Sequence, residues 1–183
     1  ALFIKEITTE MTVKAGQKCT AIRRIIVPVA QVDSVSRALK HSLDQVVMGD
    51  PTVKGVRMGP LVGQEQCADI KETVALLSQH CDVIYGGNDV EMTLEGEGVQ
   101  PHAFYPPTLL YCASPMTTDA AHSIEAFGPV STIMPYETID QAVAMAQLGK
   151  GSLVGSIVTY DDQEATQFVM DAAAFHGRIL VLN

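Results

Sequence analysis

The stretch AGQKCTAIRRIIVPVA, residues 15–30, places a glycine and a cysteine directly before a run of β-branched residues. Val and Ile favour strands, so this run predicts a strand, and Pro28 indicates that the strand ends near the edge of a sheet. Gly16 can end a helix, which predicts a preceding helix over residues 2–14. Cys19 is therefore expected in a short loop between a helix and a strand.

Helical and extended patterns alternate through the rest of the chain. Apolar residues recur at spacings of three and four in the helical segments, whereas proline, glycine and β-branched residues mark the extended ones. Asp33 and Thr138 are expected to cap two helices. Residues 88–101 are expected to form a surface loop, and the strand over residues 152–160 is expected to be buried. Helices are predicted over residues 32–47, within 58–80, over 137–149 and over 161–175, and extended segments over residues 82–87, 103–112, 125–136, 152–160 and 177–183.

This alternation predicts an α/β fold with a mostly parallel sheet flanked by helices, formed by a single domain over residues 1–183. The hydrophobic fraction of 47% is typical of a folded domain and not of a disordered chain. In sheets of this kind, ligands bind in the loops at the strand ends. The loops around the predicted strands are therefore where functional residues are expected.

The charge and the cysteine content argue against several classes of function. The chain has 21 acidic and 12 basic residues, a net charge of -9, which disfavours nucleic acid or an anionic membrane as a partner. No apolar stretch approaches the roughly 20 residues that span a bilayer. The four cysteines form no CxxC pair, so we expect a reducing cytoplasm, with no disulfide scaffold and no metal site.

Cys19 is the first candidate for chemistry. A nucleophilic thiol must ionise near neutral pH, be accessible and lie near backbone N–H groups that stabilise an oxyanion. The loop after Gly16 supplies access, and the charge of Lys18 favours a thiolate. The alternative is that Cys19 is a small buried residue at the start of a strand, as many free cysteines are.

Glu125, in the stretch IEAFGPV, is the second candidate. A single carboxylate among apolar residues is costly to bury unless hydrogen-bond donors surround it, and the two hydroxyls of a ribose would supply them. Phe127 offers a flat apolar face, and Gly128 allows a close approach of the backbone. The alternative is an exposed turn glutamate beside a core phenylalanine.

Taken together, these segments resemble the aldehyde dehydrogenase superfamily. GQKCTA and EAFGPV are similar to two signature motifs of the family, and they occur in the family's order. The segments MGDPTVKGVRMGPLVG, FYPPTLL, GSLVGSIVT and GRILVLN resemble further parts of the family, also in order. The resemblance covers essentially the whole chain and implies most of a catalytic domain.

The resemblance implies a role for each matched residue. Cys19 would add to an aldehyde to form a thiohemiacetal, with its own backbone N–H in the oxyanion hole, and the product would be a carboxylate. Glu125 would hold the nicotinamide ribose of NAD or NADP, and Phe127 would pack near the nicotinamide. Gly16 and Gln17 would belong to the loop that presents the cysteine.

GQKCTAIRR and EAFGPVST are most similar to the branch that oxidises CoA-linked semialdehydes in phenylacetate and benzoate degradation and generally prefers NADP. The resemblance implies that the nucleotide-binding domain, the general-base glutamate, an oxyanion-hole asparagine and the oligomerisation segment lie outside this chain. We therefore expect a homo-oligomeric parent enzyme and an inactive isolated chain. Arg23 and Arg24 are expected in surface ion pairs and not in a CoA phosphate site.

Two other interpretations stay open at this stage. The chain can be an aldehyde-dehydrogenase-like structural or assembly module in which Cys19 is idle. It can also belong to another thiol acyl-transfer enzyme, which requires a histidine base near Cys19. Selective labelling of Cys19 by an electrophile distinguishes the first of these from a catalytic domain. The cysteines to compare with it are Cys67, Cys81 and Cys112.

Overall fold

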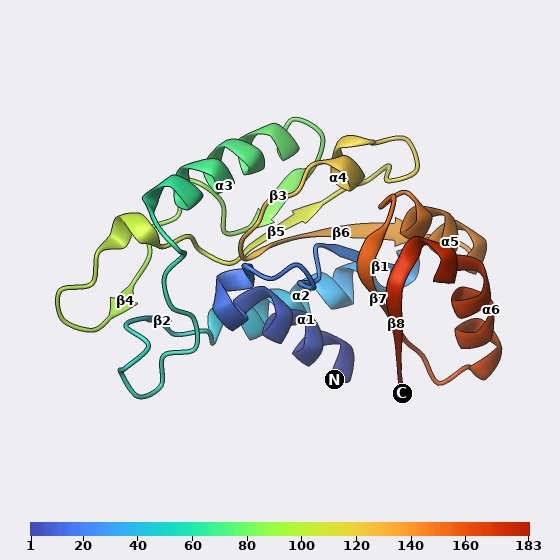
Figure 1. Ribbon diagram of the computed structural model, residues 1–183, viewed down its shortest axis with the longest axis horizontal. Helices are drawn as coiled ribbons and strands as arrows, with labels where there is room; N and C mark the ends of the chain where they lie inside the picture. Colours follow the sequence, from blue (N-terminus) through green and yellow to red (C-terminus); the bar gives the residue numbers. More distant parts are fainter.

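A four-stranded sheet in the order β1-β6-β5-β3 forms the centre of the molecule (Figure 1). The structure is a computed structural model, and it describes all residues, 1–183. β1 (Arg24–Pro28) pairs in parallel with β6 (Val130–Tyr136), and β6 pairs in parallel with β5 (Thr108–Tyr111). β3 (Asp82–Tyr85) is antiparallel to β5. The predicted α/β fold with a mostly parallel sheet is confirmed.

Helices cover both faces of this sheet (Figure 1). α1 (Leu2–Thr12) and α2 (Val32–Asp44) lie against one face, and α3 (Gln64–Leu77) lies on the other. Successive side chains of a strand point to opposite faces, so each strand supplies both cores. The core under α1 and α2 receives Ile25, Val27, Leu109 and Ile133, and the core under α3 receives Leu110, Cys112 and Met134.

The predicted buried face of α3 is confirmed, because Cys67, Ile70, Val74 and Leu77 are all buried. Short elements connect the larger ones, and β4 (Leu94–Glu95), within the expected surface loop of residues 88–101, pairs in parallel with β2 (Met48–Gly49) as a small ribbon. Further short elements are η1 (Val13–Gly16), η2 (Val29–Gln31), η3 (Pro101–Ala103) and α4 (Ala120–Ser123).

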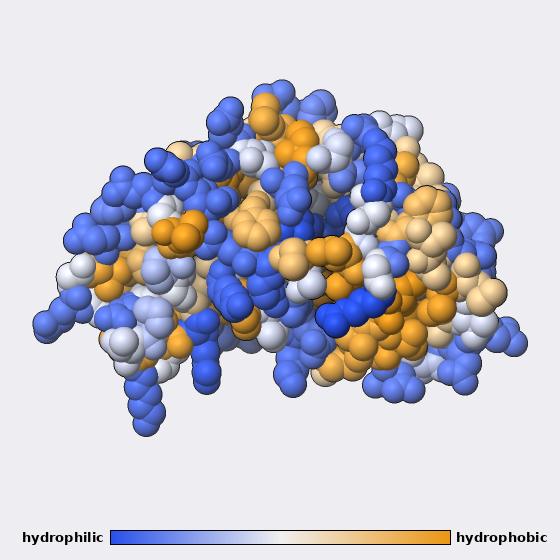
Figure 2. All heavy atoms as spheres, in the orientation of Figure 1, coloured by the Kyte–Doolittle hydropathy of each residue, from blue (hydrophilic) through white to orange (hydrophobic).

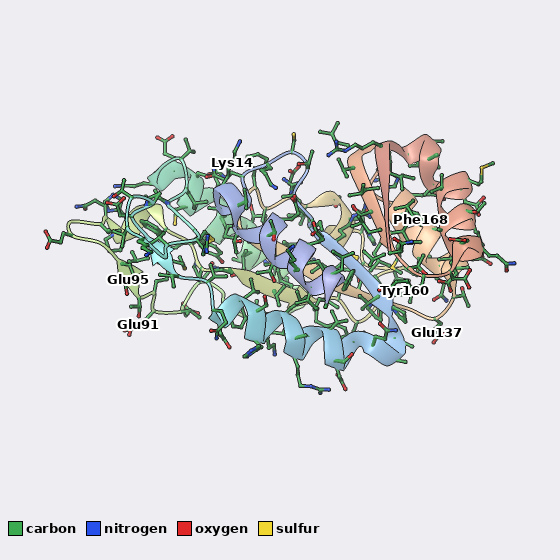
Figure 3. The ribbon with its side chains drawn as sticks, turned by 90° about the horizontal axis from the view of Figure 1, so that it is seen from below. Lys14, Glu91, Glu95, Glu137, Tyr160 and Phe168 are labelled. Carbon is green, nitrogen blue, oxygen red and sulfur yellow. The ribbon has the colours of Figure 1, made fainter.

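The C-terminal part forms a second, two-stranded sheet. β7 (Ser152–Val158) pairs in parallel with β8 (His176–Leu182), and α6 (Asp162–Ala172) connects them before a last turn, η4 (Ala173–Phe175). α5 (Ile139–Gln147) leads from β6 to β7. Side chains of α5 and α6 form a small core with this sheet, which includes Phe168 on α6 (Figure 3).

Two expectations about these elements are wrong. β7 is not buried, because it pairs only with β8 and the ribbon leaves Leu153, Leu180 and Val181 exposed; apolar atoms gather there in Figure 2. Asp33 does not cap α2: the turn η2 leads directly into the helix, so Gln31 takes the N-cap position without a side-chain bond.

The other predicted cap is confirmed, since the Thr138 hydroxyl accepts a hydrogen bond of 3.3 Å from the backbone N–H of Gln141 at the start of α5. None of the helices combines the length and the apolar character that a membrane crossing requires.

Candidate functional site

The turn after α1 is built from consecutive left-handed residues. Lys14, Ala15 and Gly16 have φ values of 55°, 51° and 69°, and Lys14 is seen where α1 ends (Figure 3). A left-handed conformation costs a non-glycine residue roughly 1–2 kcal/mol. The surrounding packing must offset this cost, and the burial of Ala15, which is 2% exposed, supplies part of it.

Gly16 joins the cysteine loop to the loop before β6. A Cβ at Gly16 would overlap the backbone carbonyl of Gly128, so no other residue fits this position without a backbone shift. Next to it, the side-chain oxygen of Gln17 accepts a 3.0 Å hydrogen bond from the backbone N–H of Val62. The match of Gly16 and Gln17 to a presenting loop is therefore consistent with their contacts.

Cys19 is the only exposed cysteine of the chain, and the buried alternative for this residue is wrong. The backbone N–H groups of Cys19 and Thr20 donate to no acceptor in the chain. Cys67 donates from its Sγ to the Phe104 carbonyl at 3.3 Å, and burial raises the pKa of Cys81 to about 12. The loop thus presents one accessible thiol beside two free backbone donors.

Lys18 does not direct its charge toward Cys19. Its Nζ lies 2.7 Å from Oε2 of Glu10 on α1, so the ammonium is paired on the side of the helix. The geometry therefore does not support the expectation that the charge of Lys18 favours a thiolate at Cys19. A different cation, Arg23, is the one that interacts with the charge of Cys19.

Arg23 brings the two predicted site residues of the EAFGPV stretch together. Its Nη2 lies 2.6 Å from Oε1 of Glu125, and its guanidinium carbon lies 5.4 Å from the centre of the Phe127 ring. The same Nη2 donates to the Lys18 carbonyl at 3.2 Å. Burial lowers the pKa of Arg23, while the charges of Glu125 and then Cys19 raise it. Arg23 is therefore a half-buried cation between the two loops.

Cys19, Glu125 and Phe127 line one cavity. It has a volume of about 1010 Å³ and runs from the two loops toward β7. The Glu125 side chain is 56% exposed, and Phe127 is 37% exposed. Both loops precede their strands, β1 and β6, whose parallel register begins with Arg24 opposite Thr132. The site consequently lies at the amino ends of these two parallel strands.

Arg24 has a structural role that differs from the expected surface ion pair. Its Nη1 donates to the Met145 carbonyl at 2.6 Å, and its Nη2 donates to the Ala146 carbonyl and the Ser152 hydroxyl, each at 3.2 Å. Arg24 also lies 3.1 Å from Nδ1 of His122. It forms no ion pair and instead closes the end of α5. Arg23 does form an ion pair, but a shielded one, with its side chain 23% exposed.

No hydrogen bond joins a histidine to Cys19, and the rings of His122 and His176 bond to other partners. The thiol acyl-transfer interpretation therefore lacks its base. No three His, Cys, Asp or Glu side chains lie close enough together to hold a metal ion. Sequence reasoning singled out Cys19, Glu125 and Phe127 but missed the role of Arg23, whose only sequence signal was a charged residue just before a strand.

In sequence, residues 1–179 match the Aldehyde dehydrogenase family. The chain is 41% identical over 182 residues to the 3,4-dehydroadipyl-CoA semialdehyde dehydrogenase of Aromatoleum evansii. This alignment covers 100% of this chain and 35% of that protein. It is 47% identical over 127 residues to Protein MaoC of Klebsiella aerogenes, covering 69% of this chain and 36% of that protein. The chain thus spans about a third of the length of these relatives.

Solved structures show the same fold. Betaine aldehyde dehydrogenase of Staphylococcus aureus in complex with NAD+ has a TM-score of 0.85 at 21% identity, over 97% of this chain and 34% of that chain. Succinic semialdehyde dehydrogenase of Streptococcus pyogenes in complex with NADP+ has a TM-score of 0.82 at 23% identity, over 97% and 37%. With its sequence matched over residues 1–179, the chain belongs to the aldehyde dehydrogenase family.

Proposed function

We propose that this chain is the catalytic part of an NAD(P)-dependent aldehyde dehydrogenase, with Cys19 as its nucleophile. One observation carries the proposal: the accessible Cys19 thiol, beside free backbone N–H groups, lines the same cavity as Glu125 and Phe127. A thiol that only filled space would have no reason to stand exposed in such a loop.

In the proposed reaction, the Cys19 thiolate adds to the aldehyde carbon and forms a thiohemiacetal, and the carbonyl oxygen becomes an oxyanion. The unpaired backbone N–H groups of Cys19 and Thr20 are the donors that this chain offers to that oxyanion. Loss of hydride gives a thioester, which water cleaves to the carboxylate and the free thiol.

The residues of the cavity fit a nicotinamide cofactor. Glu125 uses one carboxylate oxygen for Arg23, and its other oxygen has no protein partner and remains for a ribose hydroxyl. Phe127 supplies an exposed aromatic face beside it. The volume is at the upper end of the roughly 300–1,000 Å³ of small-molecule sites. When bound, the cofactor supplies the hydride acceptor. We favour NADP because the branch that GQKCTAIRR and EAFGPVST resemble generally prefers it.

We further propose a CoA-linked semialdehyde from aromatic catabolism, including phenylacetate degradation, as the substrate. The support is the 41% identity, over the whole chain, to a protein named 3,4-dehydroadipyl-CoA semialdehyde dehydrogenase. The nucleotide-binding domain, the general base and the oligomerisation segment would come from the rest of the parent protein, a cytoplasmic homo-oligomer. Residues 1–183 would then be a single catalytic domain that is inactive alone.

The test of the nucleophile is Cys19→Ala in the complete protein that contains this chain. We expect aldehyde oxidation to be lost while cofactor affinity stays nearly unchanged, because the thiol forms the covalent intermediate and other groups bind most of the cofactor. Reduced-cofactor absorbance and a cofactor titration measure the two properties. Substantial reduced cofactor from the variant would remove Cys19 from this role and favour a non-catalytic module.

The test of the ribose contact is Glu125→Gln. A charged acceptor makes stronger hydrogen bonds than an amide, so the substitution should misplace the nicotinamide more than it weakens binding. A misplacement of about 1 Å costs on the order of a hundredfold in rate. Single-turnover absorbance follows the hydride step, and an unchanged step would mean that Glu125 is a solvated turn residue.

A further inference from the structure

Arg23 contacts Glu125 and Phe127 directly and reaches the Cys19 loop through the Lys18 carbonyl. It pairs with Glu125 at 2.6 Å, lies 5.4 Å from the centre of the Phe127 ring and donates to the Lys18 carbonyl, directly before Cys19. We propose that Arg23 is a positioning residue that holds Glu125 in its working orientation and fixes that orientation relative to the Cys19 loop. The inference rests on the proposed function of Glu125 as the ribose acceptor.

Glu125 needs such a partner because its own loop does not fix it. The side chain is 56% exposed, and its only polar contact is with Arg23. A free glutamate loses considerable rotamer entropy when it is ordered, and that loss would otherwise lower the binding affinity for the cofactor. Arg23, at 23% exposed, is already held by Lys18 and Phe127, so the pair is ordered before a cofactor arrives.

The contacts of Arg23 suit a guanidinium and not an ammonium. A planar guanidinium can stack on the ring of Phe127 while it donates in its own plane to Glu125 and to the Lys18 carbonyl. Lysine would keep the charge but lose the stacked, forked geometry. The conservative variant therefore separates the effect of charge from the effect of orientation.

An unsatisfied donor argues against a purely structural role for Arg23. Its Nε is buried without any hydrogen-bond partner, which is a cost that a residue retained only for stability would avoid. Arg24, the adjacent residue, shows the contrast, since its guanidinium bonds to the carbonyls of Met145 and Ala146. Arg23 thus makes a short ion pair with Glu125, while its own Nε is left without a hydrogen-bond partner.

The experiment is a double-mutant cycle in the complete protein with Arg23→Gln, Glu125→Gln and the pair, and with Arg23→Lys as a second variant. Arg37→Gln, on the exposed side of α2 and without an ion pair, is the matched control. The readouts are the single-turnover hydride rate, the cofactor Kd and the thermal midpoint. Together they separate orientation, binding and folding.

We expect Arg23→Gln to slow the hydride step about tenfold or more, within the hundredfold that a 1 Å displacement costs, with small changes in Kd and thermal midpoint. Arg23→Lys should recover part of the rate, and Arg37→Gln should change nothing. In the Glu125→Gln background, Arg23→Gln should add little, because residues that act through one another are not additive.

Three outcomes overturn the inference in different ways. If Glu125→Gln slows the hydride step and Arg23→Gln multiplies that loss in full, Arg23 does not act through Glu125 and the proposed function survives alone. If Glu125→Gln leaves the hydride step unchanged, the ribose role and the positioning role fail together. A fall in thermal midpoint that matches the loss of rate in both Arg23 variants would likewise make the role structural.

Discussion

The backbone of Gly16 rests directly against the carbonyl of Gly128, and this contact fixes the Cys19 loop to the loop that carries Glu125. The contact requires the absence of a side chain at Gly16 and a φ of 69° at the same residue. Because backbone meets backbone, no rotation of a side chain can relieve an added methyl group. The distance between Cys19 and Glu125 therefore depends on Gly16, which takes part neither in the proposed covalent step nor in cofactor binding.

Gly16→Ala should destabilise the protein and slow the hydride step. The strain of a left-handed alanine costs roughly 1–2 kcal/mol, and the overlap with Gly128 adds to it. Gly98→Ala is a matched control, because Gly98 has a φ of 71° and open space around its Cα. Denaturant unfolding should show a larger loss for Gly16→Ala, and equal losses would mean that the contact with Gly128 is not restrictive.

Cys19 should react with iodoacetamide well before the other cysteines. It is exposed, whereas Cys67, Cys81 and Cys112 are buried, and burial also raises the pKa of Cys81 to about 12. Peptide mapping after timed alkylation of the folded protein measures the order. Alkylation of Cys67 or Cys112 at the rate of Cys19 would show that these two thiols are not buried in the folded protein.

Stability should fall as the pH falls below about 6.5, and His122 should account for part of the change. Burial, opposed by the hydrogen bond to the Pro115 carbonyl, lowers the pKa of His122 from its ordinary value of 6.5; the charge of Arg24 lowers it further, and that of Asp119 raises it. The unfolded state then binds the proton more readily, so acid favours unfolding until both states are protonated. Unfolding at several pH values should show a smaller decline for His122→Gln than for the unchanged protein.

Arg24→Met should lower the free energy of unfolding by about 1–3 kcal/mol, since it leaves the carbonyl of the buried Met145 without a donor and removes one of the donors to the Ala146 carbonyl. Arg178→Met, on the exposed side of β8, is the control for the loss of one arginine charge. Urea unfolding compares the two variants. Equal midpoints would show that Arg24 contributes nothing beyond its charge.

The sequence was sufficient for the elements whose burial repeats with a regular period. The apolar spacing in α3 predicted its buried face, including Cys67, and the β-branched run after Cys19 predicted β1. Local chemistry was less reliable at helix ends. Thr138 caps α5 as expected, but α2 begins at Val32 directly after the turn η2, which leaves Asp33 inside the helix and not at its cap.

Long-range charge pairing is what the sequence could not predict. Lys18 is next to Cys19 in the chain, yet its ammonium pairs with Glu10 on the preceding helix, α1. Arg23 meets Glu125 from a distant segment, and periodicity does not encode which charges meet. The exposure of β7 was also hidden, because an apolar strand has the same composition whether one face or both are covered.

The parallel pairing of β1 with β6 has a consequence for synthesis of the protein. β1 leaves the ribosome long before β6 exists, and at about 5–20 residues per second the interval is on the order of ten seconds. Long-range parallel pairing is also slow to form once both strands are present. During that time Cys19 is a nascent-chain thiol without Arg23–Glu125 packing around it. A cellular oxidant or electrophile would therefore find Cys19 as accessible in the unfinished polypeptide as it is in the finished fold, where the thiol stays exposed.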